Sequence, residues 1–223
     1  MSTKKHTNES EINVGEALNK TERFLQENGK ILTYVVAAVV AVIALGFGYQ
    51  YLYRAPLKKE ALNQMFIAEQ HFRADDFDLA LNGDGNTLGF SQIIDDYGNA
   101  APKSVYFYAG ICQLQLGNYN EAINTLKRYK SGDPILYARS LCNIGDAYAS
   151  LSQNTEALNY YKRAAAQSDN VFAAQYMMKA AFIEEENGNK DAAIKLYEEI
   201  KLKYPQSMEG FEADKYISRL QTQ

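Results

Sequence analysis

The segment GNYNEAI, residues 117–123, decides the fold, because two related segments follow it at a nearly constant interval. SQNTEAL begins about 35 residues later at Ser152, and GNKDAAI begins about 36 residues after that at Gly188. Each segment opens with residues that favour a turn and continues with an alanine and an aliphatic residue at helical spacing. Recurrence at this period is typical of stacked helix pairs, in which each pair buries its apolar face against its neighbours.

Small and large residues surround these turns in the same order each time. A small residue stands in the preceding helix, where a second helix must approach closely; the three are Gly110, Gly145 and Ala181. Large apolar residues and prolines follow, namely Leu126, Tyr129 and Pro134, then Tyr161, then Tyr197, Ile200 and Pro205. This pattern resembles the tetratricopeptide repeat, a pair of antiparallel helices of about 34 residues. The resemblance implies an all-α superhelix that binds other proteins.

An earlier copy of the pattern is distorted. The run Asp76–Leu81 fits a turn followed by the start of a second helix, with Ala68 as the small residue. Asn82–Asn86, which reads NGDGN, then breaks the helix, and helical periodicity resumes at Phe90. We therefore expect the first helix pair to be interrupted.

An uncharged stretch, ILTYVVAAVVAVIALGFGYQYLY, occupies residues 31–53. As a helix it is about 35 Å long at about 1.5 Å per residue, enough to cross a hydrocarbon core of about 30 Å. The run exceeds the 7–15 residues or so of a signal-peptide core, which favours a retained anchor. The sequence therefore predicts one transmembrane helix.

Together these features predict an all-α chain with one N-terminal transmembrane helix, a superhelix of about four helix pairs and a C-terminal cap. The expected extents are a tail and amphipathic lead-in over 1–30, the transmembrane helix over 31–53, a linker over 54–60, repeats over 61–206 interrupted at 82–89, and a capping helix over 207–223.

Charge and composition argue against several kinds of function. The chain has 23 Lys and Arg against 27 Asp and Glu, so it lacks the basic surface that nucleic-acid binding needs. His6 and His71 stand far apart, and no phosphate-binding glycine loop is present. Cys112 and Cys142 are expected to be buried free thiols. We expect no enzyme activity, no cofactor, no metal site and no small-molecule substrate.

The inner face of a tetratricopeptide superhelix is lined by positions 2, 5, 9 and 12 of each first helix. Carried onto this chain, these positions are Leu62, Met65, Glu69 and Phe72; Ser104, Phe107, Ile111 and Leu114; Arg139, Cys142, Asp146 and Ala149; and Gln175, Met178, Phe182 and Glu185. The resemblance favours an apolar protein-binding groove made by Met65, Phe72, Phe107, Ile111, Leu114, Met178 and Phe182. The alternative is that the phenylalanines simply pack within the superhelix.

Two further surfaces are candidates for partner contact. The segment containing Asn82, Asp84 and Asn86 alternates oxygen ligands like the start of a calcium loop, but the rest of that loop is missing, so a surface turn is favoured. It could be a partner-contact loop. In the predicted span, small residues fall on one helix face, which suits packing against a membrane partner; they are Ala37, Ala41, Ala44 and Gly48.

The order of a short tail, one span and a small repeat array resembles the YfgM-like ancillary subunit of the bacterial Sec translocon. The segment LALNGDGNTLGFSQIIDDYG, residues 79–98, is similar to that of Bacteroidota proteins with the same layout. The resemblance implies an inner-membrane protein with a cytoplasmic N-terminus and a periplasmic repeat domain, whose partners are the Sec channel, envelope chaperones or client proteins. Positive charges flank both ends of the span, so charge bias does not decide the topology. A scaffold subunit of another envelope assembly or secretion machine is the alternative.

Overall fold

The structure is a computed structural model that describes residues 8–130, 132–167 and 170–222. All regular structure in this part of the chain is helical, which confirms the all-α prediction. The chain divides into two compact units, with the boundary between Pro56 and Leu57. Residues 1–7 of the expected polar tail lie outside the described residues.

The first unit is helical from its first described residue. α1 spans Asn8–Gly48, and a π-helix, η1, continues it over Tyr49–Arg54. Within the described part, the helical run Glu22–Arg73 contains one stretch that is long and apolar enough to cross a membrane, and that stretch has no buried residues. The expected transmembrane helix 31–53 lies inside this run.

Residues 54–60, the expected linker, are helical, and the boundary between the two compact units falls among them. Arg54 ends η1 and α2 begins at once at Ala55, extending to Arg73. Pro56 lies inside the helical run Glu22–Arg73, just after the π-helix η1, and it has no amide hydrogen to donate to the preceding turn.

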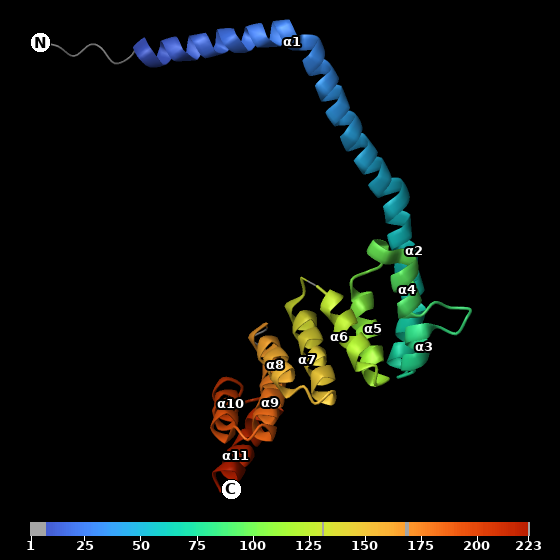
Figure 1. The fold of residues 1–223 in the computed structure, drawn as a ribbon, viewed down its shortest axis with the longest axis vertical. Helices are drawn as coiled ribbons and strands as arrows, with labels where there is room; N and C mark the ends of the chain where they lie inside the picture. The colour runs from blue at the N-terminus through green and yellow to red at the C-terminus, as the bar shows by residue number, and fades with distance from the viewer. Residues whose placement is uncertain (1–7, 131, 168–169, 223) are drawn as a thin grey trace, which may run out of the picture. The chain divides into compact units, whose positions relative to one another are not determined.

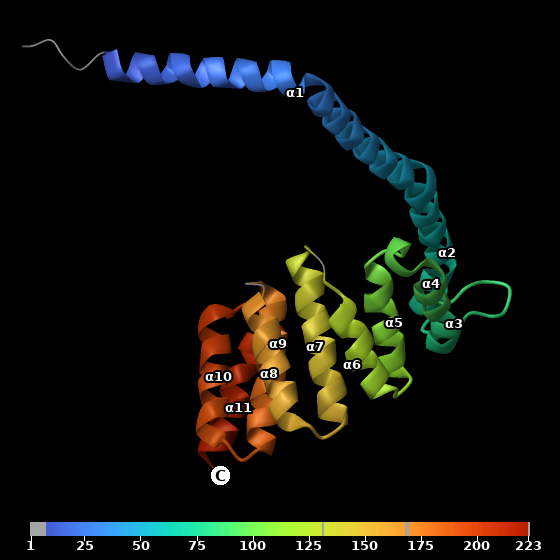
Figure 2. The ribbon, with the colours of Figure 1, turned by 45° about the horizontal axis from the view of Figure 1, so that its top comes forward.

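The second unit is a series of helix pairs stacked in chain order (Figures 1 and 2). In the first pair, the second helix is split into two short helices. The pairs are α2 with α3 (Phe77–Asn82) and α4 (Phe90–Tyr97); α5 (Ser104–Gln115) with α6 (Tyr119–Arg128); α7 (Pro134–Ser150) with α8 (Asn154–Gln167); and α9 (Val171–Glu186) with α10 (Lys190–Lys203). A short 3-10 turn, η2 (Gly98–Ala100), follows α4, and α11 (Met208–Gln221) packs on the last pair.

Every first helix ends in the same way. One residue adopts a left-handed conformation, and the next amide donates to the carbonyl five residues earlier, which satisfies the carbonyl groups left open at a helix end. The left-handed residues are Asp75, Gly117, Ser152 and Gly188. The four hydrogen bonds are Asp76 to His71 (3.0 Å), Asn118 to Gln113 (2.8 Å), Gln153 to Tyr148 (2.9 Å) and Asn189 to Glu184 (2.8 Å). This shared ending is why the turn segments recur in the sequence.

The small residues let the paired helices approach closely. A Cβ atom placed on Gly145 would lie 2.6 Å from Cε1 of Tyr161, and one placed on Gly110 would lie 2.5 Å from Cγ of Leu126. Carbon atoms in good contact are about 3.5–4.0 Å apart, so neither position has room for a methyl group. Ala181, the third small residue, is fully buried.

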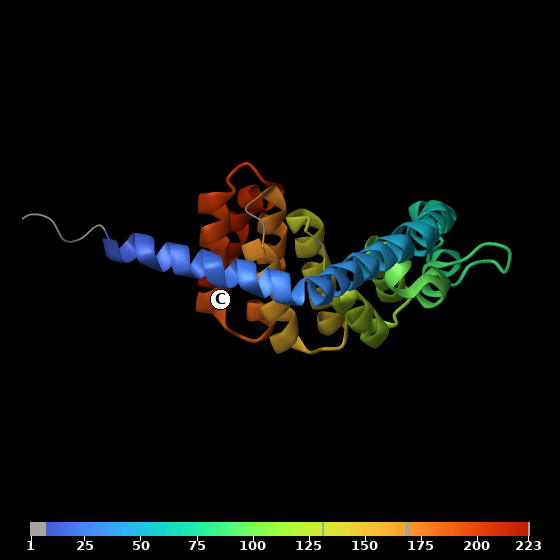
Figure 3. The ribbon, with the colours of Figure 1, turned by 90° about the horizontal axis from the view of Figure 1, so that it is seen from above.

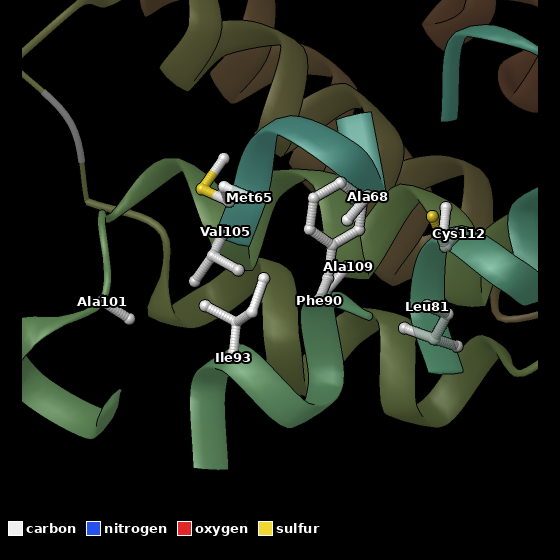
Figure 4. Close-up of a cluster of buried hydrophobic side chains, with 10 residues drawn as sticks. Met65, Ala68, Leu81, Phe90, Ile93, Ala101, Val105, Ala109 and Cys112 are labelled. Carbon is white, nitrogen blue, oxygen red and sulfur yellow. The ribbon is translucent and has the colours of Figure 1, made fainter. Parts of the chain in front are cut away.

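The first core joins all three helices of the split pair to α5. Met65 and Ala68 of α2 face Phe90 and Ile93 of α4, with Val105 of α5 beside them (Figure 4). Between α3 and α4, residues 83–89 form a loop that projects from the helices in both views (Figures 1 and 3), with 84–86 exposed and Leu88 packed back on the first core. The split therefore preserves the core while exposing one segment.

α11 covers the apolar end of the last pair. Its Tyr216 ring stacks on the Tyr197 ring of α10 at 5.2 Å, and its Leu220 is buried. Lys201 of α10 pairs with Asp214 of α11 at 2.6 Å. α11 therefore acts as a terminal cap, which covers the apolar face that the last pair of a repeat array would otherwise expose.

Candidate functional site

Four of the seven predicted groove residues are buried, so the prediction that they line an open groove is wrong for them. Met65, Phe107, Ile111 and Met178 belong to the cores of the array. Phe107, for example, packs against Tyr129, with the two ring centroids 5.3 Å apart. These side chains stabilise the stacking of the pairs, and a partner cannot reach them.

The other three predicted groove residues are only partly accessible. The ring of Phe72 packs edge-on against the ring of Tyr108, with the two centroids 5.1 Å apart. Leu114 packs against the core formed between α5, α6 and α7. Phe182 remains 37% exposed, although its ring meets Tyr216 of the capping helix at 5.4 Å. The structure does not gather the seven residues into one apolar groove.

The partner-contact loop is organised around Asp84. Its Oδ1 accepts hydrogen bonds from the backbone of Asn86 (2.9 Å) and from the backbone and hydroxyl of Thr87 (2.7 and 2.8 Å). These bonds lower the pKa of the Asp84 carboxyl. Asn82 ends α3, and its side chain donates to Asp78 at 2.8 Å. The loop is held in shape by its own groups.

The small residues of the predicted transmembrane face all lie in α1. Ala37, Ala41 and Ala44 are exposed, and a Cβ atom on Gly48 would meet nothing within 4 Å. This face therefore has room for another helix.

A better candidate lies between α7 and α9, the first helices of the third and fourth pairs. A hollow of about 310 Å³ opens there, lined by residues of both helices. Its apolar side chains stand at the helix starts: Ile135 is 45% exposed and Phe172 is 49% exposed. Both starts are fixed by side-chain caps, since Asp133 accepts from the Ile135 amide and Asn170 from the Phe172 amide, each at 2.9 Å.

Deeper in the hollow a charged network joins three helices. Oδ1 of Asp146 accepts from Nζ of Lys179 at 2.5 Å and from the Tyr161 hydroxyl at 2.8 Å. Burial and the Asp146 charge both raise the pKa of Tyr161, so the phenol stays protonated and donates. Burial opposes the charge on Lys179, but Cys142 and Asp146 raise its pKa overall. Lys179 therefore keeps its positive charge at neutral pH.

The hollow also holds polar groups without partners. Arg139 forms no ion pair or hydrogen bond with any other described residue, and it is exposed. Nδ2 of Asn143 is buried and has no hydrogen-bond partner in the described part of the chain. An unsatisfied buried donor costs about 1–3 kcal/mol.

The cysteines are buried free thiols, and Cys142 lies at the hollow. Burial raises the pKa of each thiol to about 12, so neither is a thiolate at neutral pH. Among the described residues, no group of three His, Cys, Asp or Glu side chains is placed to hold a metal ion.

Sequence reasoning placed Arg139, Cys142, Asp146 and Gln175 at groove positions, and the structure brings all four to this hollow. It missed Asn143 and Lys179, which stand one residue beyond position 5 of their helices. Their polarity within helices that are otherwise largely apolar was a usable signal, because a polar residue on such a face needs a partner.

Comparison with known proteins agrees with this architecture. Tetratricopeptide-repeat family models match residues 104–134 and 142–207. Two crystal structures of MamA are similar to this chain, each at 22% sequence identity. The first match covers 70% of this chain and 93% of the MamA chain, with a TM-score of 0.50. The second covers 73% of this chain and 90% of the MamA chain, with a TM-score of 0.52. No curated protein matches the chain. Residues 104–134 and 142–207 therefore carry tetratricopeptide repeats, and the helical array has the fold of such repeats.

Proposed function

We propose that this protein is a non-enzymatic adaptor, held at a membrane by one helix, whose repeat array binds other proteins. The observation that supports this is the presence, in one chain, of a tetratricopeptide array and a helical run long and apolar enough to cross a bilayer. Such repeats typically serve as protein-interaction scaffolds. The span would limit the array to partners found at the same membrane.

The finer proposal is association with the Sec translocon of a bacterial inner membrane, with the N-terminus cytoplasmic and the repeats periplasmic. It is supported by the resemblance in element order and in the interrupted first repeat. The array would then meet emerging client proteins and envelope chaperones. Docking on the channel would use the small-residue face of α1, where helices without large side chains can approach closely.

Two experiments test this proposal. Protease treatment of intact spheroplasts should digest the repeat array, and protection of the array would refute the periplasmic topology. Purification of the full chain in mild detergent, with quantitative mass spectrometry, should enrich translocon subunits or envelope chaperones. Replacing Ala41 and Gly48 by leucine should reduce this recovery while the protein stays in the membrane. Unchanged recovery would make the helix a plain tether.

A second candidate is a scaffold subunit of another envelope assembly or secretion machine. It is favoured by the exposed 83–89 loop, because a rigid protruding segment suits a fixed partner. In that case Asp84→Ala should abolish association, whereas Arg139→Gln at the hollow should leave it intact. The opposite result would favour binding through the α7 and α9 face.

A further inference from the structure

We infer that one end of the repeat array rests on the surface of a bilayer that contains anionic lipids. We call it the entry end, because the second unit begins there at Leu57; it holds the starts of α2, α5, α7, α9 and α11 and the ends of α6, α8 and α10. Apolar side chains of this end would enter the boundary between headgroups and acyl chains, and lysines would meet the headgroups. The inference rests on the proposed anchoring of the chain at a membrane.

The entry end is the part of the array that the chain reaches first after the predicted span. Successive helices run in opposite directions, so α2, α5, α7 and α9 all start at the same end (Figure 2). Tyr53, the last residue of the predicted span, precedes Leu57 by four residues, which reach at most about 14 Å when extended. The start of α2 therefore stays close to any bilayer that the span crosses.

Large apolar side chains are exposed at the entry end, where α9, α10 and α11 pack together. Val171 and Phe172 begin α9, Leu202 lies in the last turn of α10, and Met208 and Phe211 lie in the first turn of α11. Leu202, Met208 and Phe211 are 82%, 78% and 71% exposed. At the opposite end, the exposed large apolar residues of the described array are only 37–40% exposed; they are Leu79, Leu116 and Phe182. An apolar patch of this kind marks a surface that something else covers.

A cationic cluster lies beside this patch, at the start of α5 and the end of α6. It consists of Lys103, Lys127, Arg128 and Lys130, which are all exposed. Lys127 donates to the hydroxyl of Tyr148, and Arg128 donates to the hydroxyl of Tyr106, each at 2.9 Å. These partners are neutral phenols, so they leave both positive charges uncompensated. A membrane surface with anionic headgroups attracts such a cluster.

The opposite end of the array is acidic. The second helix of every pair starts there with a carboxylate in its first turn; the four are Asp78, Glu121, Glu156 and Asp191. α9 ends there in Glu184-Glu185-Glu186. Carboxylates such as Asp95 and Glu209 also occur at the entry end, but the cationic cluster and the lysines of α10 balance them. Of the two ends, the entry end is the one that can approach an anionic surface without strong repulsion.

The test places a single tryptophan in the full chain, which has none. Phe211→Trp puts it in the exposed patch, and Leu116→Trp, the control, puts it at the opposite end. Both variants are reconstituted in vesicles of phosphatidylcholine and phosphatidylglycerol whose acyl chains carry bromine, which quenches tryptophan on contact. We expect the emission of Phe211→Trp to be quenched and shifted to the blue, and that of Leu116→Trp to match its emission in plain vesicles. If Phe211→Trp emits equally in brominated and plain vesicles, with unchanged circular dichroism, the inference is wrong. Equal quenching of both variants would also overturn it.

Two pairs of charge variants, made in the Phe211→Trp chain, test the lipid class. Lys103→Gln with Lys130→Gln should lower the ratio of docked to undocked arrays by about thirtyfold, which is about 1 kcal/mol for each cation. Lys190→Gln with Lys195→Gln removes the same charge from the first half of exposed α10, nearer the opposite end, and should leave the ratio unchanged. Equal effects of the two pairs contradict the inference. So does equal quenching in vesicles of phosphatidylcholine alone.

The outcome is separable from that of the proposed function. If the chain resists alkaline extraction from vesicles and recovers membrane partners while Phe211→Trp stays unquenched, the anchored adaptor stands and the inference fails. If Phe211→Trp is quenched and the chain recovers no protein partner, the array lies on the bilayer and the adaptor role fails.

Discussion

Replacing Gly145 by alanine tests the close approach of α7 and α8. The new Cβ would lie 2.6, 2.7 and 3.2 Å from Cε1, Cδ1 and Cζ of Tyr161. The ring cannot withdraw freely, because Tyr161 is buried and its hydroxyl donates to Asp146. Overpacking of this kind costs about 1–3 kcal/mol, whereas alanine gains about 1 kcal/mol over glycine inside a helix. We therefore expect a net loss of stability of about 0–2 kcal/mol.

A double-mutant cycle isolates the clash from the helix propensity. Tyr161→Val removes all three ring atoms that the new methyl group would meet, so in that background Gly145→Ala should stabilise the array by up to about 1 kcal/mol. The coupling between the two positions is then about 1–3 kcal/mol. Urea unfolding of the full chain in detergent, followed by circular dichroism at 222 nm, measures each corner. An equal effect of Gly145→Ala in both backgrounds would refute the reasoning.

Three further predictions use other parts of the chain. Ser152→Gly should stabilise the array by about 0.5–1 kcal/mol in the same urea assay, because Ser152 holds a left-handed conformation where two other repeats have glycine. Cys112 and Cys142 should react with a thiol reagent at pH 8 only in denaturant, because both are buried. Folding raises the pKa of both thiols from 9 to about 12, so their contribution to the stability of the array is complete below pH 9 and is lost as the pH rises toward 12. Unfolding measured at increasing alkaline pH checks this loss. Asp84→Ala should speed hydrogen exchange at the Thr87 amide without changing the melting of the array, and slow exchange there would show that Asp84 does not hold the loop.

Much of the fold could be predicted because its determinants are local in sequence. The turn segments, the small residues and the apolar spacing each depend on one backbone ending or one helix contact. Gly145 is the clearest case: a missing side chain signals a close neighbour, and Tyr161 is that neighbour. The sequence did not show that the helix continues through Arg54-Ala55-Pro56, because a proline usually ends or kinks a helix.

The candidate site was predicted only in part, because a position on a helix face does not show how much a neighbouring element covers it. Phe107 and Arg139 both stand at predicted groove positions. Tyr129 packs over Phe107, which is buried, whereas nothing covers Arg139, which is exposed. That difference depends on the packing of rings from other helices, and no local pattern encodes it.

The split second helix of the first pair has a mechanical consequence. In a chain held at a membrane by its N-terminal helix and bound to a partner through its repeats, as proposed above, load would enter the array through α2. The pair that receives it has α3 and α4, of six and eight residues, in place of one longer second helix. Short helices joined by an exposed loop resist tension less than a continuous helix, since fewer backbone hydrogen bonds must break together. Under force, the array should open at its first pair while the later pairs stay folded.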